Sequence, residues 1–236
     1  MMTNPSRGMI LDRDLTPDLL DVALRVATDP TPWVDKRKLL TVALRDHVSE
    51  QEANGKTKKC LTRVWINPPP DAAGMVAWGR DHRQLAIDRR LLHLGALTAT
   101  FPFVGGISAL VGRALALDGY ADPGDIRQRA RAIWGDRPAI DVGARKAYTT
   151  LLRFGVLTGG GRTPLARGEV FEADARMAGW IIHSLLLTRG CRSVSDTELG
   201  VAPELFWLKF DRPDGCYPLL ERHKEGDRRV IWAVVP

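Results

Sequence analysis

Five side chains that suit nucleic-acid chemistry fall on one face of a helix that the sequence predicts over residues 141–154. They are basic or carry a hydroxyl group: Arg145, Lys146, Thr149, Thr150 and Arg153. Residues three or four positions apart share a face of an α-helix, here the face opposite an apolar stripe. Arg and Lys bind guanine edges or phosphates, while Thr binds backbone oxygens or thymine methyl groups. The pattern favours a helix that binds duplex DNA over an ordinary solvated face.

The chain directly after this helix has the pattern of a short β-hairpin with a basic tip. Residues 155–157 suit an apolar strand, residues 158–163 form a glycine-rich turn, and the returning strand follows. Arg162 and Arg167 flank the tip, where the wing of a DNA-binding module meets the backbone or the minor groove. Residues 140–170 hold five Lys or Arg against two acids, which gives a local charge of +3. Half of the chain's net charge of +6 therefore lies in this segment.

Another helix is predicted just before the basic one, ending at Trp134. Asp122-Pro123 is typical of a helix start. The apolar stripe of this helix consists of Ile126, Ala130, Ile133 and Trp134. Arg127 and Arg131 lie outside the stripe and are candidate phosphate contacts, although an ordinary solvated face is the favoured explanation for them. The order helix, link, helix and hairpin predicts a winged helix-turn-helix over residues 121–172.

The flanking segments complete the expected fold, which is mainly α. Residues 1–120 predict an N-terminal helical bundle, with the basic clusters 36–38 and 56–59 as weak candidates for further nucleic-acid contacts. Residues 173–236 predict C-terminal helices plus a β-hairpin, either a cap on the first winged module or a second, degenerate winged unit. The whole is expected to be a helical bundle followed by one or two winged modules with short β-hairpins.

Composition argues against several other classes of protein. The chain has 236 residues, 44% hydrophobic and 26% charged, which fits a globular protein. Its three cysteines are far apart, so we expect neither a disulfide scaffold nor a zinc site. The same cysteine usage predicts a reducing, cytoplasmic location. The five histidines lack metal-ligand spacing, and no phosphate-loop, dinucleotide-binding, nucleophile-elbow or zinc-protease motif occurs. We therefore expect no metal, no cofactor and no catalytic residues.

One stretch has the length of a membrane span. The run between Arg90 and Arg113 has 22 residues without a charged side chain. Pro102 interrupts it, and the residue before a proline disfavours the helical conformation. The N-terminal residues also lack the apolar segment of a signal peptide. We expect two buried helices at 91–112 and no membrane partner.

The middle of the chain resembles the BrxA family of small proteins from BREX phage-defence systems. The resemblance covers residues 91–165 and lies in LLHLGALTATFPFVGGISALVGRALALDG, the helix ending in Trp134-Gly135, and ARKAYTTLLRFGVLTGGGRTPL. It implies an N-terminal helical bundle, likened to NusB, and a winged-helix portion. It also implies that the protein binds double-stranded DNA without a catalytic site, with other defence proteins as potential partners. Some seventy residues at the C-terminus lie outside the matched region.

Three functions stay open at the level of sequence. The leading one is a non-enzymatic DNA-binding accessory protein whose affinity comes mainly from phosphate contacts and falls with salt. The second is a transcription regulator of similar fold, which predicts sharp preference for one operator and a dimer. The third is a protein-interaction subunit that touches no nucleic acid and binds its partner through exposed apolar surface.

Overall fold

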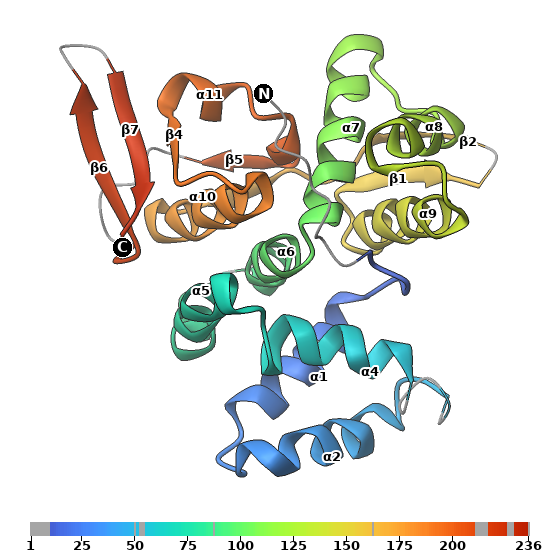
Figure 1. Ribbon diagram of the computed structural model, residues 1–236, viewed down its shortest axis with the longest axis vertical. Helices are drawn as coiled ribbons and strands as arrows, with labels where there is room; N and C mark the ends of the chain where they lie inside the picture. Colours follow the sequence, from blue (N-terminus) through green and yellow to red (C-terminus); the bar gives the residue numbers. More distant parts are fainter. Residues whose placement is uncertain are drawn as a thin grey trace.

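The computed structural model describes residues 10–235, apart from positions 50, 52–54, 87, 162, 211–216 and 226–228. Within these residues the protein is mainly helical with three small sheets, which confirms the predicted mainly α character. One continuous apolar core joins residues from Leu11 near the N-terminus to Trp232 near the C-terminus. Figure 1 shows a lower group of helices with two lobes above it, one of them containing the C-terminal strands.

The lower group is built from the first part of the chain. Thr16 begins its first helix, because its Oγ1 accepts a hydrogen bond from the Leu19 amide at 3.3 Å and Pro17 occupies the first helical position. Its elements are α1 (Pro17–Thr28), α2 (Trp33–Leu44), α4 (Lys56–Leu61), the π-helical turn η1 (Thr62–Ile66), α5 (Pro70–Asp81) and the 3-10 turn η2 (Arg83–Leu85).

Helices α6 (Arg89–Thr100) and α7 (Pro102–Asp118) contain the uncharged run. They meet at Phe101 with a bend of 110°, so the predicted break before Pro102 is confirmed. Every α6 residue after the first two is buried inside the protein. In the described part of the chain, no single helix is long and apolar enough to cross a membrane.

Helix α10 (Ala175–Arg189) joins the lower group to the C-terminal lobe. The carboxylate of Asp174 accepts from the Met177 amide at 2.8 Å and begins the helix. Trp180 of α10 is fully buried against Gly79 of α5 and Gly95 of α6. A Cβ atom at Gly95 would lie 2.0 Å from Trp180 Nε1, so the helices approach this closely only because these positions lack side chains.

The right-hand lobe of Figure 1 follows α7 along the chain. It consists of α8 (Pro123–Trp134), α9 (Pro138–Arg153) and the antiparallel strands β1 (Leu157–Gly160) and β2 (Thr163–Arg167). Ala121 and Leu165 exchange two backbone hydrogen bonds of 2.8 Å, which attaches the residue before α8 to the outer side of β2.

The C-terminal lobe repeats part of this arrangement around α10. The antiparallel sheet has the order β4 (Ser193–Ser195), β7 (Arg229–Val234), β6 (Leu220–Glu225). Between β4 and β6 come α11 (Asp196–Gly200), the 3-10 turn η3 (Pro203–Leu205) and β5 (Leu208–Phe210), which pairs in parallel with β3 (Phe171–Ala173). Ser195 and Glu198 form a capping box at the start of α11: the Glu198 carboxylate accepts from the Ser195 amide at 2.9 Å.

Candidate nucleic-acid interface

Helices α8 and α9 belong to the lobe that contains β1 and β2, and the local sequence explains most of their bounds. Asp122 begins α8 by accepting from the Gly124 and Asp125 amides at 2.7 and 3.0 Å. Helix α9 begins at Pro138, three residues before the predicted start, because proline is preorganised for the first helical position. The predicted inward placement of Ile133 is also wrong, since its side chain is exposed.

The outer face of α9 carries three of the predicted contact residues. Arg145 and Arg153 are exposed and Thr149 is half-buried, on the side opposite the buried Ala144 and Leu151. Neither arginine forms an ion pair with a described residue closer than 4.0 Å. Val142, exposed at 41%, extends the same row and is an apolar candidate that the sequence pattern missed.

Thr150 and Lys146 do not belong to this open face. Thr150 is fully buried, and its Oγ1 accepts a hydrogen bond from the Leu15 amide at 3.0 Å. The Lys146 ammonium donates to the Asp14 carboxylate at 2.6 Å. Partial burial raises the pKa of Asp14, but the bond from Lys146 and the nearby Arg153 outweigh it and hold the pKa below its ordinary value. The prediction of Thr150 as a DNA contact is therefore wrong, and Lys146 is engaged within the protein.

These two corrections have one cause, the packing of the N-terminal segment along α9. Leu11 and Leu15 are fully buried, and Ile10 lies so close to α9 that a Cβ atom at Gly143 would come within 2.0 Å of its Cγ2. The segment covers the flank of α9 that carries Thr150. Helical periodicity identifies the face of a residue but contains no information about a segment more than a hundred residues away.

We expect Thr150→Val to destabilise the fold while leaving any duplex affinity unchanged. The valine keeps the shape of the side chain but leaves the buried Leu15 amide without an acceptor, a loss of about 1.5 kcal/mol in the free energy of unfolding. Urea unfolding measures this loss. The matched Thr149→Val variant changes a half-buried position and should stay within about 0.5 kcal/mol of the wild type. Equal losses in both variants would contradict the structural role of Thr150.

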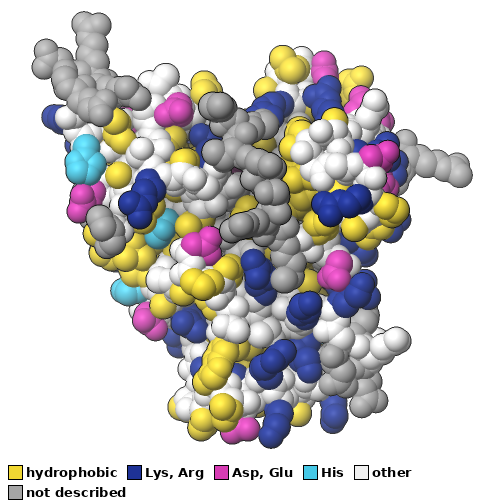
Figure 2. All heavy atoms as spheres, viewed as in Figure 1, with side chains coloured by type: hydrophobic (Ala, Val, Ile, Leu, Met, Phe, Trp, Pro, Cys, Tyr) yellow, Lys and Arg dark blue, Asp and Glu magenta, His cyan; other side chains and the backbone are white. Residues whose placement is uncertain are grey.

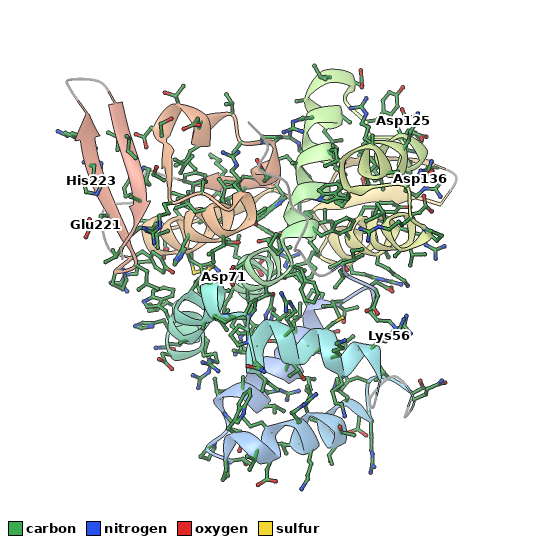
Figure 3. The ribbon with its side chains drawn as sticks, in the orientation of Figure 1. Lys56, Asp71, Asp125, Asp136, Glu221 and His223 are labelled. Carbon is green, nitrogen blue, oxygen red and sulfur yellow. The ribbon has the colours of Figure 1, made fainter. Side chains whose placement is uncertain are left out.

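The two candidate phosphate contacts on α8 share one acidic partner. Arg127 Nη1 and Arg131 Nη1 lie 3.2 and 3.0 Å from the two carboxylate oxygens of Asp141. Asp141 sits in the first turns of α9, so these ion pairs fix the angle between the two helices. Figure 3 shows Asp125 and Asp136 at the outer edge of the same helix pair. A phosphate bound by either arginine would therefore compete with Asp141.

The hairpin leaves the C-terminal end of α9 and is tied to the core. Leu165 of β2 is buried, whereas Arg167 at the end of β2 is exposed. Gly159 has φ +85°, and a Cβ atom there would lie 2.2 Å from the Pro164 carbonyl oxygen, so the tight turn requires glycine. Arg162, predicted at the tip, lies outside the described residues.

Arg90 of α6 anchors the segment that follows the hairpin. Its guanidinium binds Glu169 through two bonds of 2.7 and 2.9 Å and also donates to Asp88 at 2.6 Å. The hydrogen bonds that it donates to Asp88 and then to Glu169 raise the pKa of Arg90 above its ordinary value. The same group stacks over the Phe171 ring at 4.5 Å. This cluster positions the hairpin relative to the central helices.

The surface below α9 is mixed in charge. Arg153 lines a depression of about 280 Å³ together with Arg13, Asp14, Asp18 and Thr57. Figure 2 shows further Lys and Arg side chains over α4 and the neighbouring helices, with acids between them. Some of these cations have internal partners: Lys56 lies 3.4 Å from Asp12, Lys58 donates to Thr41 at 3.0 Å, and Lys36 donates to the Ala27 carbonyl.

Groups suited to metal binding or thiol chemistry are not gathered in the described part of the chain. No three of its His, Cys, Asp or Glu side chains are placed to hold a metal ion. Burial and the adjacent Asp12 raise the pKa of the Cys60 thiol to about 12, which keeps it protonated and unreactive.

Comparison with known proteins gives no relative: no protein-family model, curated protein or solved structure matches the chain.

Proposed function

We propose that the protein is a non-enzymatic binder of double-stranded DNA that uses α9 as a recognition helix and the β1–β2 hairpin as a wing. The observation that carries this proposal is the row Arg145, Thr149 and Arg153 on the outer face of α9. A helix in a major groove presents such a row to phosphates and base edges. The exposed Arg167 on the hairpin is suited to the adjacent backbone.

The order of elements supports a winged helix-turn-helix interpretation of residues 102–167. A leading helix, α7, is followed by a one-residue strand at Ala121, two helices and a hairpin. Ala121 pairs with the second hairpin strand, which gives the sheet order Ala121, β2, β1. The third helix, α9, directly precedes the hairpin and corresponds to the one that enters the groove in such modules.

The charge distribution of residues 102–167 favours binding to the phosphate backbone of DNA over recognition of one base sequence. On α9 the open cations are Arg145 and Arg153, because Lys146 is held by Asp14. On α8, Arg127 and Arg131 are held by Asp141. Affinity should then depend strongly on salt and only weakly on base sequence.

The decisive experiment compares the double variant Arg145→Ala, Arg153→Ala with the wild type. We expect duplex affinity to fall about tenfold or more. The slope of log affinity against log salt concentration should shrink by about 2, because the variant makes two fewer phosphate contacts and therefore releases fewer counterions on binding. Fluorescence anisotropy with a labelled duplex at about 50 and 200 mM salt measures both quantities.

A variant with the same loss of charge elsewhere separates local contacts from net charge. Arg25 on α1 and Arg83 on η2 are both exposed. Arg25→Ala, Arg83→Ala should bind the duplex within about twofold of the wild type. If both double variants lose affinity equally, α9 is not the recognition helix.

The biological setting rests on the resemblance of residues 91–165 to BrxA proteins. We propose an accessory role in a BREX-like phage-defence system, with other defence proteins as partners. In a host that depends on the protein for protection, the Arg145→Ala, Arg153→Ala allele should fail to restore resistance to phage. Full protection by this allele would separate the defence role from DNA binding.

A second candidate function, a protein-interaction subunit, is favoured by α2. Three apolar side chains of α2 are exposed: Trp33 at 46%, Val34 at 74% and Val42 at 58%. Of the residues of this helix, only Leu40 and Leu44 are buried. Exposed apolar side chains gathered on one short helix are typical of a partner-binding surface. Lack of duplex binding by the wild-type protein at about 50 mM salt would favour this function.

A further inference from the structure

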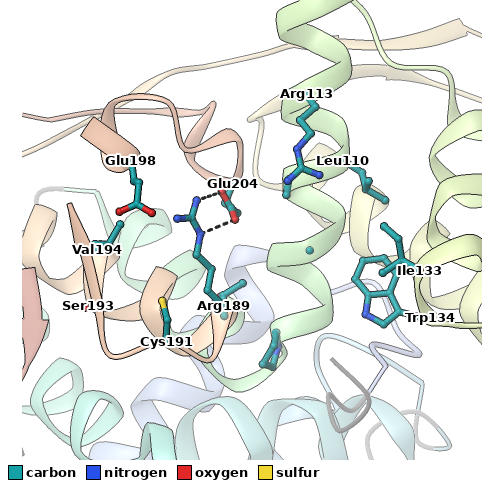
Figure 4. A pocket seen from close by; sticks show the side chains of 14 residues that line it. Leu110, Arg113, Ile133, Trp134, Arg189, Cys191, Ser193, Val194, Glu198 and Glu204 are labelled. Carbon is teal, nitrogen blue, oxygen red and sulfur yellow. Dashed lines mark hydrogen bonds and ion pairs between the residues drawn. The ribbon is translucent and has the colours of Figure 1, made fainter. Parts of the chain in front are cut away.

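A cleft of about 370 Å³ separates α7 and α8 from the C-terminal lobe. One wall comes from α7 and the end of α8, and the opposite wall from the end of α10, β4, α11 and η3 (Figure 4). Its volume is within the range of small-molecule sites. It lies on different residues from the open row of α9, so it is a separate feature of the protein.

The α7–α8 wall offers an apolar surface. Leu110 and Trp134 line it, and Ile133 exposes 36% of its side chain there. The Trp134 ring lies directly on the α7 backbone, because a Cβ atom at Gly106 would come within 2.6 Å of its Cζ2. The indole is therefore held in place before any ligand arrives, which reduces the entropy cost of binding.

Two hydrogen-bond donors on the same wall have no acceptor among the described residues. Trp134 Nε1 is buried and makes no hydrogen bond. Arg113 of α7 lines the cleft and forms no ion pair with a described residue. The Trp134 N–H is closed off from the cleft, as are the equally unpaired N–H groups of Trp180 and Trp207, so the donor that this wall presents to a ligand is the Arg113 guanidinium.

The opposite wall is balanced within the protein. Arg189 binds both carboxylate oxygens of Glu204 at 2.9 and 2.8 Å, and Glu198 accepts from the Ser195 hydroxyl at 2.7 Å. In Figure 4 the Arg113 guanidinium faces the Arg189–Glu204 pair across the cleft. The charge that a ligand can neutralise is therefore the guanidinium of Arg113.

We propose that this cleft binds a small organic anion, an apolar body that carries one carboxylate. The carboxylate accepts hydrogen bonds from the Arg113 guanidinium, while the apolar body packs on Trp134, Leu110 and Ile133. Arginine matches a carboxylate with two parallel donors, which gives this arrangement its preference for an anion.

The test uses the whole protein and 3-phenylpropanoate as the probe, with 3-phenylpropanamide as its uncharged counterpart. Calorimetric titration should detect 3-phenylpropanoate, and the amide should bind about tenfold more weakly because it lacks the charge that Arg113 pairs with. Inorganic phosphate, an anion without the apolar body, should bind more weakly than 3-phenylpropanoate.

Three variants locate the binding site. Arg113→Gln should weaken 3-phenylpropanoate about tenfold and remove the preference over the amide. Ile133→Ala removes part of the exposed apolar wall and should weaken binding severalfold. Arg129→Gln, an exposed residue of α8 outside the lining, should change nothing. Circular dichroism confirms that each variant is folded. Equal binding of carboxylate and amide, unchanged binding by Arg113→Gln, or no binding of the probe would each overturn the proposal.

Discussion

Replacing Gly95 with alanine should lower the free energy of unfolding by about 2–3 kcal/mol. The new methyl group would be placed 2.0 Å from Nε1 of Trp180, a fully buried ring that also lies against Gly79. Neither the Trp180 ring nor α6 can move aside without a large energy cost, because an indole has no flexible end and α6 is buried along nearly its whole length. The helices α6 and α10 must therefore move apart, which opens the core that joins the lobes.

The same substitution at Gly74 provides the control. Gly74 lies in the middle of α5, is exposed, and has no atom within 4 Å of an added Cβ. Gly74→Ala should therefore stabilise the protein by up to about 1 kcal/mol through helix propensity and a less flexible unfolded chain. Urea unfolding of both variants measures the difference. If Gly95→Ala proved as stable as Gly74→Ala, the close packing of Trp180 against α6 would be wrong.

The features that sequence alone located depend on neighbours in the chain. The cap at Asp122, the break before Pro102 and the outward row of Arg145, Thr149 and Arg153 each follow from residues within one or two helical turns. Side-chain capping, the fixed φ of proline and the 3.6-residue period act over that range. The winged arrangement and the three-part division of the chain remain predictions.

The features that sequence missed depend on contacts between distant segments. Leu15 meets Thr150 across 135 positions, and Asp14 meets Lys146 across 132. Asp141 looked like a simple helix start, yet its ion pairs with α8 reduce the charge available for DNA. No local pattern distinguishes a threonine that faces solvent from one that accepts a hydrogen bond from a packed segment. The charge count of +3 for residues 140–170 therefore overstated what the surface can offer a ligand.

A second large effect is expected from acid, through the buried histidines. His183 is 4% exposed, and burial lowers its pKa from 6.5 to about 4. His93 is fully buried and its pKa is lowered in the same direction, mainly by burial. Below pH 6.5 these histidines bind protons in the unfolded chain but stay neutral in the folded protein. Their neutral state therefore costs no stability above pH 6.5, and the free energy of unfolding falls as the pH drops from 6.5 toward 4. For His183 alone the loss at pH 4.5 is about 2.5 kcal/mol.

Urea unfolding at pH 7.5 and pH 4.5 measures this loss, and two variants assign it. His183→Asn keeps a polar group near the Tyr217 hydroxyl, which lies 2.9 Å from His183 Nδ1, but removes the titration. Its stability should change by about 2.5 kcal/mol less than that of the wild type between the two pH values, whatever its stability at pH 7.5. His223→Asn alters an exposed residue of β6 paired with Glu221 (Figure 3) and should keep the full wild-type difference. An unchanged pH difference in His183→Asn would show that other groups cause the acid sensitivity, because the burial of His183 could then not be its source.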